Sequence, residues 1–213
     1  MDMDIQTSKR AVKRAPREAK KPARLISRDS ILMQAMSLID SEGLAALTMR
    51  RLGKALGIEA MSIYYYFKNR DEVLDGVVEA VMLEISRHAE RARKTGESWS
   101  DVARRIVRAY RTAGKAHANS FQLFATRPLR TKAAITQGRE LVDAFAGAGL
   151  NNSDAVIAYR AITCFSAGFV LLETSKFKPA FSTGNFHREF NRSIDVILRG
   201  VQAEMLTAPP SRK

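Results

Sequence analysis

The chain has 213 residues, enough for one large domain or two small ones. It carries 35 Lys and Arg against 22 Asp and Glu, a formal net charge of +13. An excess of that size favours a polyanionic partner, either nucleic acid or an anionic membrane surface, and charge alone does not choose between them. The single cysteine, Cys164, excludes a disulfide framework, so we expect a cytoplasmic protein. Because Cys164 lies in an apolar run, we expect it to be a small core residue.

No secretory signal is predicted, because the basic N-terminal residues are not followed by an apolar segment. The longest apolar stretch covers residues 155–172 and is interrupted by Arg160, Thr163 and Ser166. These interruptions make it a poor membrane span, and we expect no membrane partner.

Residues 1–26 hold eight Lys and Arg, three acids and two prolines, with almost no periodic apolar residues. Such a segment buries too little surface to order itself, which predicts a disordered basic tail. The alternative is an arm that touches DNA phosphates or enters a minor groove.

The first predicted helix covers residues 28–41, with Ser27 as its N-cap and Gly43 at its end. A second helix covers residues 49–56 behind the cap residue Thr48, and Leu47 and Leu52 have the spacing of a hydrophobic staple.

Gly57 fits a left-handed turn, and a third short helix runs from Ala60 to about Phe67. Two short helices around a tight turn predict a helix-turn-helix that enters a DNA major groove. The expected inward residues are Leu52, Ala55, Leu56, Ile58, Ile63 and Phe67.

The rest of the chain also has helical periodicity, and no segment alternates with period two, so the fold class is all-α. Ser100, followed by Asp101, is the expected cap of the first helix after the Thr95–Gly96 break. The further predicted helices cover residues 99–117, 118–129, 131–147, 153–173 and 186–206. The predicted division is a tail over 1–26, a helix-turn-helix domain over 27–75, a connecting helix over 71–94, a helical domain over 96–207 and a frayed tail over 208–213.

Three consecutive motifs carry a resemblance to a known family: TMRRLGKALGI, SIYYYFKNR and DEVLDGVV. Together they make residues 47–78 resemble the DNA-binding domain of the Tet-repressor (TetR) family. Weaker similarity to the C-terminal domain of the tetracycline-repressor-like branch follows in TRP (126–128), AGL (148–150) and GFVLLE (168–173). The resemblance covers most of residues 28–206. It implies a homodimeric repressor that leaves a palindromic operator when a small ligand binds.

Arg50 is expected to face outward, where an arginine can make a bidentate contact to guanine. Ala60 and Met61 lack strong base-edge donors and could pack on thymine methyl groups instead. For Tyr65 and Tyr66, contacts to phosphate or sugar and packing on a neighbouring helix both stay open. The family resemblance supports DNA contacts at Thr48, Arg50, Ser62, Tyr64, Lys68 and Arg70. The full predicted set is Thr48, Arg50, Arg51, Ala60, Met61, Ser62, Tyr64, Tyr65, Tyr66, Lys68, Asn69 and Arg70.

The resemblance also implies a ligand pocket in the C-terminal part, although aromatic residues at helical spacing are also typical of a packed core. The metal-binding His and Glu of the family align near Leu123 and Leu172, so we expect no tetracycline–magnesium site, with Glu173 one residue away. We expect no metal and no cofactor. The candidate pocket residues are Met82, Ile85, His88, Trp99, Tyr110, His117, Phe121, Phe124, Phe145, Phe165 and Phe169.

The helices at 153–173 and 186–206 suit homodimerisation. The first has apolar residues on two faces, of which one can serve the core and the other needs a partner; a fully buried central helix is the alternative. A dimer would place two recognition helices about 34 Å apart, or a multiple of that distance, to contact a palindrome.

These patterns predict a transcriptional repressor released from its operator by a small, largely apolar ligand. An enzyme is not expected, because the chain has no P-loop, no G-x-S-x-G and no H-E-x-x-H, and its three histidines lack metal-ligand spacing. The alternative is a helical small-molecule or lipid-binding protein that acts without DNA. That alternative does not explain why Arg50, Tyr64, Lys68 and Arg70 lie together.

Overall fold

The computed structural model describes residues 26–127, 132–176 and 180–207. All regular structure in these ranges is helical, which confirms the all-α fold. The predicted tail over 1–26, apart from Ile26, and the frayed tail over 208–213 lie outside the described residues. The elements are α1 (Arg28–Glu42), the short 3-10 helix η1 (Leu44–Ala46), α2 (Met49–Leu56), α3 (Ala60–Tyr64), α4 (Arg70–Arg91), α5 (Trp99–Ala116), α6 (Ala118–Thr126), α7 (Lys132–Gly147), α8 (Asn152–Thr174) and α9 (Phe186–Thr207).

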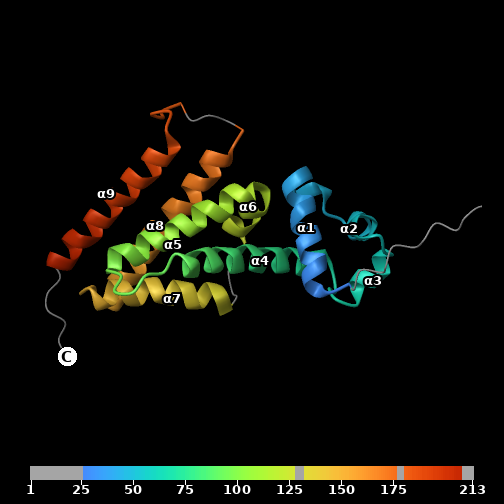
Figure 1. Cartoon of the computed structure of the whole chain (residues 1–213), viewed down its shortest axis with the longest axis horizontal. Coiled ribbons are helices and arrows are strands. Elements are labelled where there is room, and N and C mark those ends of the chain that lie inside the picture. Colours follow the sequence, from blue (N-terminus) through green and yellow to red (C-terminus); the bar gives the residue numbers. More distant parts are fainter. Residues whose placement is uncertain (1–25, 128–131, 177–179, 208–213) are drawn as a thin grey trace, which may run out of the picture.

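Helices α1, α2 and α3 form a small bundle at one end of α4 (Figure 1). From there α4 extends into the larger group formed by α5 to α9 (Figure 1). Leu52, Ile63 and Phe67 are almost fully buried, as the spacing predicts, and they join α1 and the first turns of α4 in one core. The small bundle is therefore held by the same helix that enters the larger one.

The predicted caps of the first helices are confirmed. Ser27 caps α1 in a reciprocal capping box with Ser30, and the hydroxyl of Thr48 accepts a hydrogen bond from the amide of Arg51. Gly57 has φ of 72°, a left-handed conformation that favours glycine over any residue with a Cβ.

Two local predictions are wrong in detail. α3 ends at Tyr64 rather than near Phe67, because the amides of Tyr66 and Phe67 both donate to the carbonyl of Ile63 and tighten the turn. α5 is capped by Ser98, not Ser100, in a capping box with Asp101. The acid three residues after Ser98 completes the reciprocal pair of bonds, which makes Ser98 the better cap.

Ala55 and Cys164 were expected inside but lie exposed. On α2 the buried positions are Leu52, which lies in the core, and Gly53, which lies against Ile58 and the start of α3. On α8, Cys164 lies on an apolar face that no described element covers.

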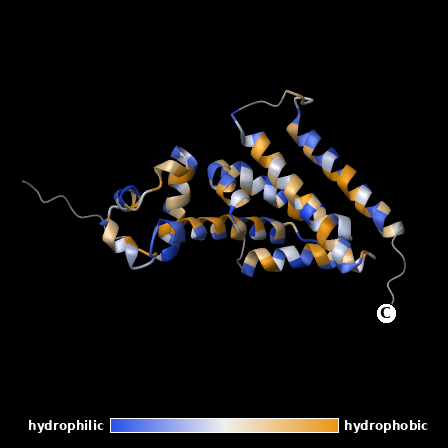
Figure 2. Ribbon diagram, turned by 180° about the vertical axis from the view of Figure 1, so that it is seen from behind, coloured by the Kyte–Doolittle hydropathy of each residue, from blue (hydrophilic) through white to orange (hydrophobic). Residues whose placement is uncertain are grey.

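In the larger group, α5 packs against α4, α7 and α8, and α9 lies along α8 (Figures 1 and 2). The buried side chains between these helices are large and apolar, as the hydropathic pattern predicts. They include Ile106, Val107, Phe121, Leu141, Phe145, Ile162, Phe190 and Ile194.

α8 is long and apolar enough, by length and composition alone, to cross a membrane. In the structure it packs against α5, α6, α7 and α9. Its buried side is marked by Ala155, Ala158 and Ile162, while Ile157 is 61% exposed. The two apolar faces expected from the sequence are therefore both present, and the outward one is not covered by any described part of the chain.

Candidate nucleic-acid interface

The turn between α2 and α3 depends on a close approach at Gly53. The amide of Ile58 donates to the carbonyl of Gly53 at 3.0 Å. A Cβ atom at position 53 would lie 2.9 Å from the carbonyl oxygen of Ile58 and 3.1 Å from the amide nitrogen of Ala60. Only glycine allows the two helices to meet this closely. Gly57 was recognisable in the sequence as a turn residue, whereas the need for glycine at position 53 was not.

Five of the predicted DNA-contacting side chains point into solvent without a polar partner among the described residues. Met61 is 71% exposed, Tyr64 44% and Tyr65 89%. Arg50 and Lys68 are exposed as well, and their charged groups make no ion pair within the described ranges. One short segment thus offers two cations and two phenol hydroxyls to an external partner. Ala60 and Ser62, from the same helix, are half-buried.

Arg70 already has partners within the chain. Its Nε donates to the carbonyl oxygen of Leu47 at 2.7 Å, and a terminal guanidinium nitrogen donates to that of Leu44 at 3.0 Å. These bonds fasten the start of α4 to the residues before α2, so Arg70 fixes the angle at which α2 leaves the bundle.

Tyr66 also bonds within the chain, although it is 37% exposed. Its hydroxyl donates to the carbonyl oxygen of Ile26 at 2.9 Å. Arg28 donates to the carbonyl oxygen of Tyr66 at 2.7 Å and lies 4.1 Å above the ring of Phe67. The side chain of Tyr65, 89% exposed, has no polar partner in the described part of the chain. Contacts of Tyr65 and Tyr66 to phosphate or sugar stay predictions. The bracing role of Arg28 was not visible in the sequence.

Three more members of the predicted set stabilise helix ends or pair with an acid. Thr48 caps α2, and the side chain of Asn69 caps α4 by accepting from the amide of Glu72. Arg51 pairs with Glu42. The amide of Lys68 donates to Glu72 at 2.7 Å, which lowers the pKa of that carboxyl.

The small bundle is joined to the larger one through His117, a residue predicted to line a pocket. One ring nitrogen lies 2.7 Å from a carboxylate oxygen of Asp40 on α1, and the other lies 2.9 Å from one of Glu84 on α4. The amide of Ser120 donates to Asp40 at 2.9 Å. The start of α6 therefore contacts the end of α1 and the middle of α4 at the same place.

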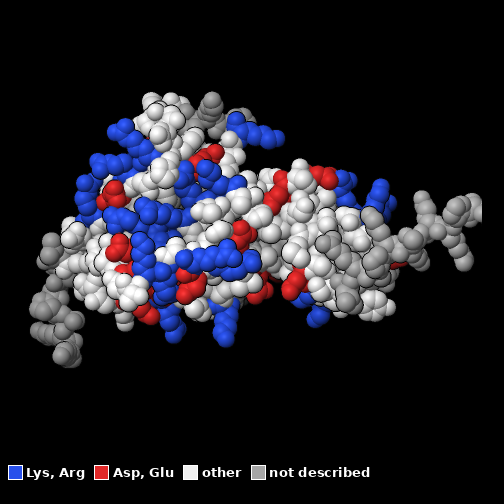
Figure 3. Space-filling model, viewed as in Figure 1, with Lys and Arg blue, Asp and Glu red and all other residues white. Residues whose placement is uncertain are grey.

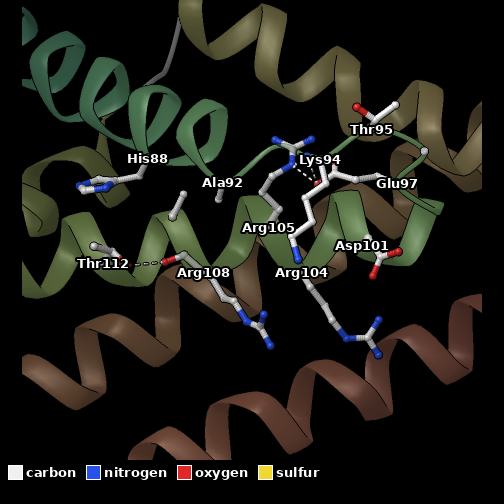
Figure 4. A pocket seen from close by; sticks show the side chains of 12 residues that line it. His88, Ala92, Lys94, Thr95, Glu97, Asp101, Arg104, Arg105, Arg108 and Thr112 are labelled. Atoms are coloured by element: carbon white, nitrogen blue, oxygen red, sulfur yellow. Dashed lines mark hydrogen bonds and ion pairs between the residues drawn. The ribbon is translucent and has the colours of Figure 1, made fainter.

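The other candidate pocket residues are distributed between the packed core and the walls of two cavities. Met82 and Ile85 are fully buried core residues of α4. The aromatic residues divide into three contact groups: Tyr110 with Phe121 and Phe124, Trp99 with Phe145, and Phe165 with Phe169, Phe186 and Phe190. His88 lines a separate cavity of about 550 Å³ whose other walls are mostly polar (Figure 4).

Glu173 lies one residue from the position that aligns with the family's metal-binding Glu. Its carboxylate is paired with Arg111. Two guanidinium nitrogens of Arg111 donate to its carboxylate at 2.7 Å each. Burial by itself would raise the pKa of Glu173, but the bonds and charges of Arg111 and Lys115 outweigh it and lower the pKa. No group of three metal-ligating side chains is present among the described residues.

Comparison with known proteins agrees with this geometry. Residues 31–77 match the family described as "Bacterial regulatory proteins, tetR family". Residues 93–181 match "Tetracyclin repressor-like, C-terminal domain". The first match begins inside α1 and ends inside α4, so it contains the whole α2–turn–α3 unit.

Among curated proteins, the chain is 33% identical over 155 residues to the Escherichia coli "Tetracycline repressor protein class C", covering 68% of this chain and 65% of that protein. Two solved structures share the fold. One is TetR-Q116A from Acinetobacter baumannii AYE in complex with minocycline, with TM-score 0.72 and 21% identity over 84% of this chain and 97% of that one. The other is BioQ with its double-stranded DNA operator, with TM-score 0.64 and 24% identity over 84% of this chain and 99% of that one.

The chain spans 65% of the length of the class C tetracycline repressor and 66% of the length of a second relative, an "HTH-type transcriptional regulator" of Saccharopolyspora erythraea that is 29% identical over 75% of this chain. The two family matches lie in the expected order, and the second contains α5 to α8 of the larger helical group. They confirm the resemblance drawn from the three motifs, and with it the class of regulator rather than enzyme. The chain belongs to the TetR family of bacterial regulatory proteins.

Proposed function

We propose that this protein is a transcriptional repressor that binds operator DNA as a homodimer through α2 and α3. One observation carries the proposal: Arg50, Tyr64, Tyr65 and Lys68 lie exposed on one helix-turn-helix, and their side chains have no polar partner within the described ranges. The similarity to the tetracycline repressor and to an operator-bound relative supports it.

Within this interface, Arg50 contacts a base edge, because a guanidinium can bind guanine in two places at once. Lys68 and the hydroxyls of Tyr64, Tyr65 and Thr48 contact phosphates, and Met61 packs on a thymine methyl group. Ala60 and Ser62 lie close to the same groove. Arg51, Tyr66, Asn69 and Arg70 act chiefly by holding the two helices in place.

The homodimer forms through α8 and α9. The outward face of α8 is apolar and not covered by any described residue, with Ile157 61% and Leu172 43% exposed. Ala161 and Gly168 on the same face would let a second helix approach closely, since neither carries a bulky side chain. On α9, Val196 is also exposed, by 58%.

A small-molecule ligand releases the repressor. One relative of the same fold is bound to minocycline, which supports a ligand site in the larger helical group. The bond network of His117 provides the path, because a shift of α6 would move Asp40 on α1 and Glu84 on α4 together. We further propose a cytoplasmic protein with its domains at 27–75 and 96–207, linked by α4.

A gel-shift assay with the DNA upstream of the protein's own gene tests the proposal. We expect a single retarded complex at low salt that Arg50→Ala and Lys68→Ala each weaken. The matched control is Arg139→Ala, which removes an exposed charge from α7 and should leave the complex unchanged. Absence of any complex at low salt would leave the other candidate, a helical small-molecule or lipid-binding protein that acts without DNA.

A further inference from the structure

Three adjoining cavities meet at Arg104 on α5. The cavity of about 550 Å³ lies between the end of α4, the α4–α5 loop and α5, and Lys94 and Arg108 also line it. A second, of about 370 Å³, lies between α5 and α9 and is lined by Arg192 and Arg199. A third, of about 80 Å³, is lined by both Arg104 and Arg108 and connects the same two helices. We call these three together the cationic groove.

Every acid in the cationic groove is already engaged. Glu97 binds Arg105 at 2.9 Å, and Asp195 binds Arg104 at 3.0 Å. Asp101 accepts from both the amide and the hydroxyl of Ser98, which lowers the pKa of its carboxyl.

Four cations of the groove make no ion pair with a carboxylate among the residues that the structure describes, although the amide of Lys94 donates to Glu97 at 3.2 Å and its charge also acts on Asp101. They are Lys94, Arg108, Arg192 and Arg199. Like charges held along one hollow repel each other, so the groove presents an unneutralised positive field.

The arrangement of these side chains suits an external anion. In Figure 4, Lys94 extends from the α4–α5 loop over α5, and Arg104 and Arg108 extend from α5 toward the neighbouring helices. Figure 3 shows that Lys and Arg side chains gather over the region of α5 and α9 on this face of the molecule. Arg105, only 3% exposed, is fixed by Glu97 and Glu140 and gives the groove a rigid floor.

We propose that the cationic groove binds a small organic anion with at least two negative charges, carried by phosphate or carboxylate groups. Guanidinium groups bind both kinds of anion through paired hydrogen bonds, and a second charge on the ligand engages Lys94 or α9 at the same time. The half-buried ring of Trp99 at one end offers an apolar contact for the rest of the ligand.

This site differs from the largely apolar pocket expected from the sequence, because most of its walls are polar and it takes only Trp99 and Phe190 from the three aromatic groups. Lys94 lies three residues after the end of α4. An anion that draws Lys94 toward α5 and α9 would therefore also shift the end of α4, the helix whose other end packs against the small bundle. The effect on DNA rests on the proposed function, whereas anion binding does not.

Isothermal titration calorimetry at constant ionic strength, with inorganic pyrophosphate and with citrate as probes, tests the site. The double variant Lys94→Ala/Arg108→Ala should bind at least about tenfold more weakly than the wild type. The matched control, Arg87→Ala/Arg139→Ala, removes the same charge from exposed positions of α4 and α7 and should stay within about twofold of wild type. Circular dichroism and thermal melting establish that both variants are folded.

Binding of pyrophosphate alone assigns a phosphate ligand, and binding of citrate alone assigns a carboxylate ligand. Binding of both probes shows that the groove selects its ligand by the number of negative charges. Equal weakening in the control, or no binding of either probe by the wild type at millimolar concentration, overturns the proposal. Competition of pyrophosphate by unrelated DNA that also depends on Lys94 and Arg108 would make the groove a nucleic-acid surface and overturn it too. The double variant should still shift operator DNA, which separates failure of this site from failure of the proposed function.

Discussion

Two arginines of the α2–α4 segment show how the same residue type takes two roles. Arg50 is exposed and has no partner among the described residues, whereas Arg70 donates to the carbonyls of Leu44 and Leu47. Sequence alone could not separate them, since both are basic residues beside a predicted helix end. The difference arises from the path of the chain before α2, which brings two carbonyl oxygens to Arg70.

Replacing Arg50 with Ala should weaken operator binding by about 1–3 kcal/mol and relax the preference at one base pair per half-site. Replacing Arg70 with Ala should instead lower the free energy of unfolding by about 1–3 kcal/mol, because it removes two hydrogen bonds from a charged donor. Binding to a panel of single-base operator variants, alongside urea unfolding, checks both. Equal weakening of Arg50→Ala binding on every sequence would make Arg50 a phosphate contact.

Gly53→Ala should destabilise the small bundle by about 1–3 kcal/mol, because the new methyl group meets backbone atoms of Ile58 and Ala60 that cannot move aside. Gly147→Ala is the control, as its Cβ would meet nothing within 4 Å and its φ is not left-handed. Thermal melting of the two variants gives the comparison. A Gly53→Ala melting temperature equal to that of wild type would show that α2 and α3 can separate without cost.

At the scale of elements, most helices were predictable from the sequence, whereas the residues at which they begin and end were less predictable. The caps Ser27 and Thr48 were predictable because a cap depends on residues within one turn. The early end of α3 was not, since it depends on two amides sharing the carbonyl of Ile63. The aromatic residues were predicted to share a pocket, but helical spacing does not say which neighbour a ring meets, and the rings divide into three groups.

α5, α8 and α9 are fastened together by Arg111, which binds Glu173 and lies 5.2 Å over the ring of Phe190. Because the folded pKa of Glu173 is below its ordinary 4.5, its contribution to stability is full above that pH. The contribution disappears as the pH falls below 4.5 through the folded pKa. Glu173→Gln should therefore flatten the fall in melting temperature as the pH is lowered below 4.5. An identical pH profile in the variant and the wild type would contradict this account.

If the homodimer forms through the outward face of α8, a charge placed on that face should disrupt it. Ile157→Glu places a charge on the apolar face and should convert the dimer to a monomer in sedimentation, while far-UV circular dichroism stays helical. Arg160→Glu, one helical turn nearby and also exposed, is the control for charge alone. A dimer that persists in Ile157→Glu would place the contact elsewhere, and loss of the dimer in Arg160→Glu as well would make the charge change, and not the loss of an apolar contact, the cause.

For the whole molecule, the small helical bundle and the larger helical group are joined through His117. His117 at the start of α6 lies within hydrogen-bonding distance of Asp40 on α1 and Glu84 on α4. Its role was not evident from the sequence, because the three residues lie far apart in the chain and meet only in the folded state. The family and the helix-turn-helix were predictable from the sequence, because both depend on short motifs whose residues are close together in the chain.

The central claim is that α2 and α3 bind operator DNA, and the salt dependence of binding tests it most directly. Fluorescence anisotropy with labelled upstream DNA should give an affinity that falls linearly with salt on a log–log scale. Lys68→Ala should reduce that slope by about 0.9 for each phosphate that is no longer neutralised, or about 1.8 for a dimer. A slope unchanged by Lys68→Ala, or no binding at low salt, would contradict the claim.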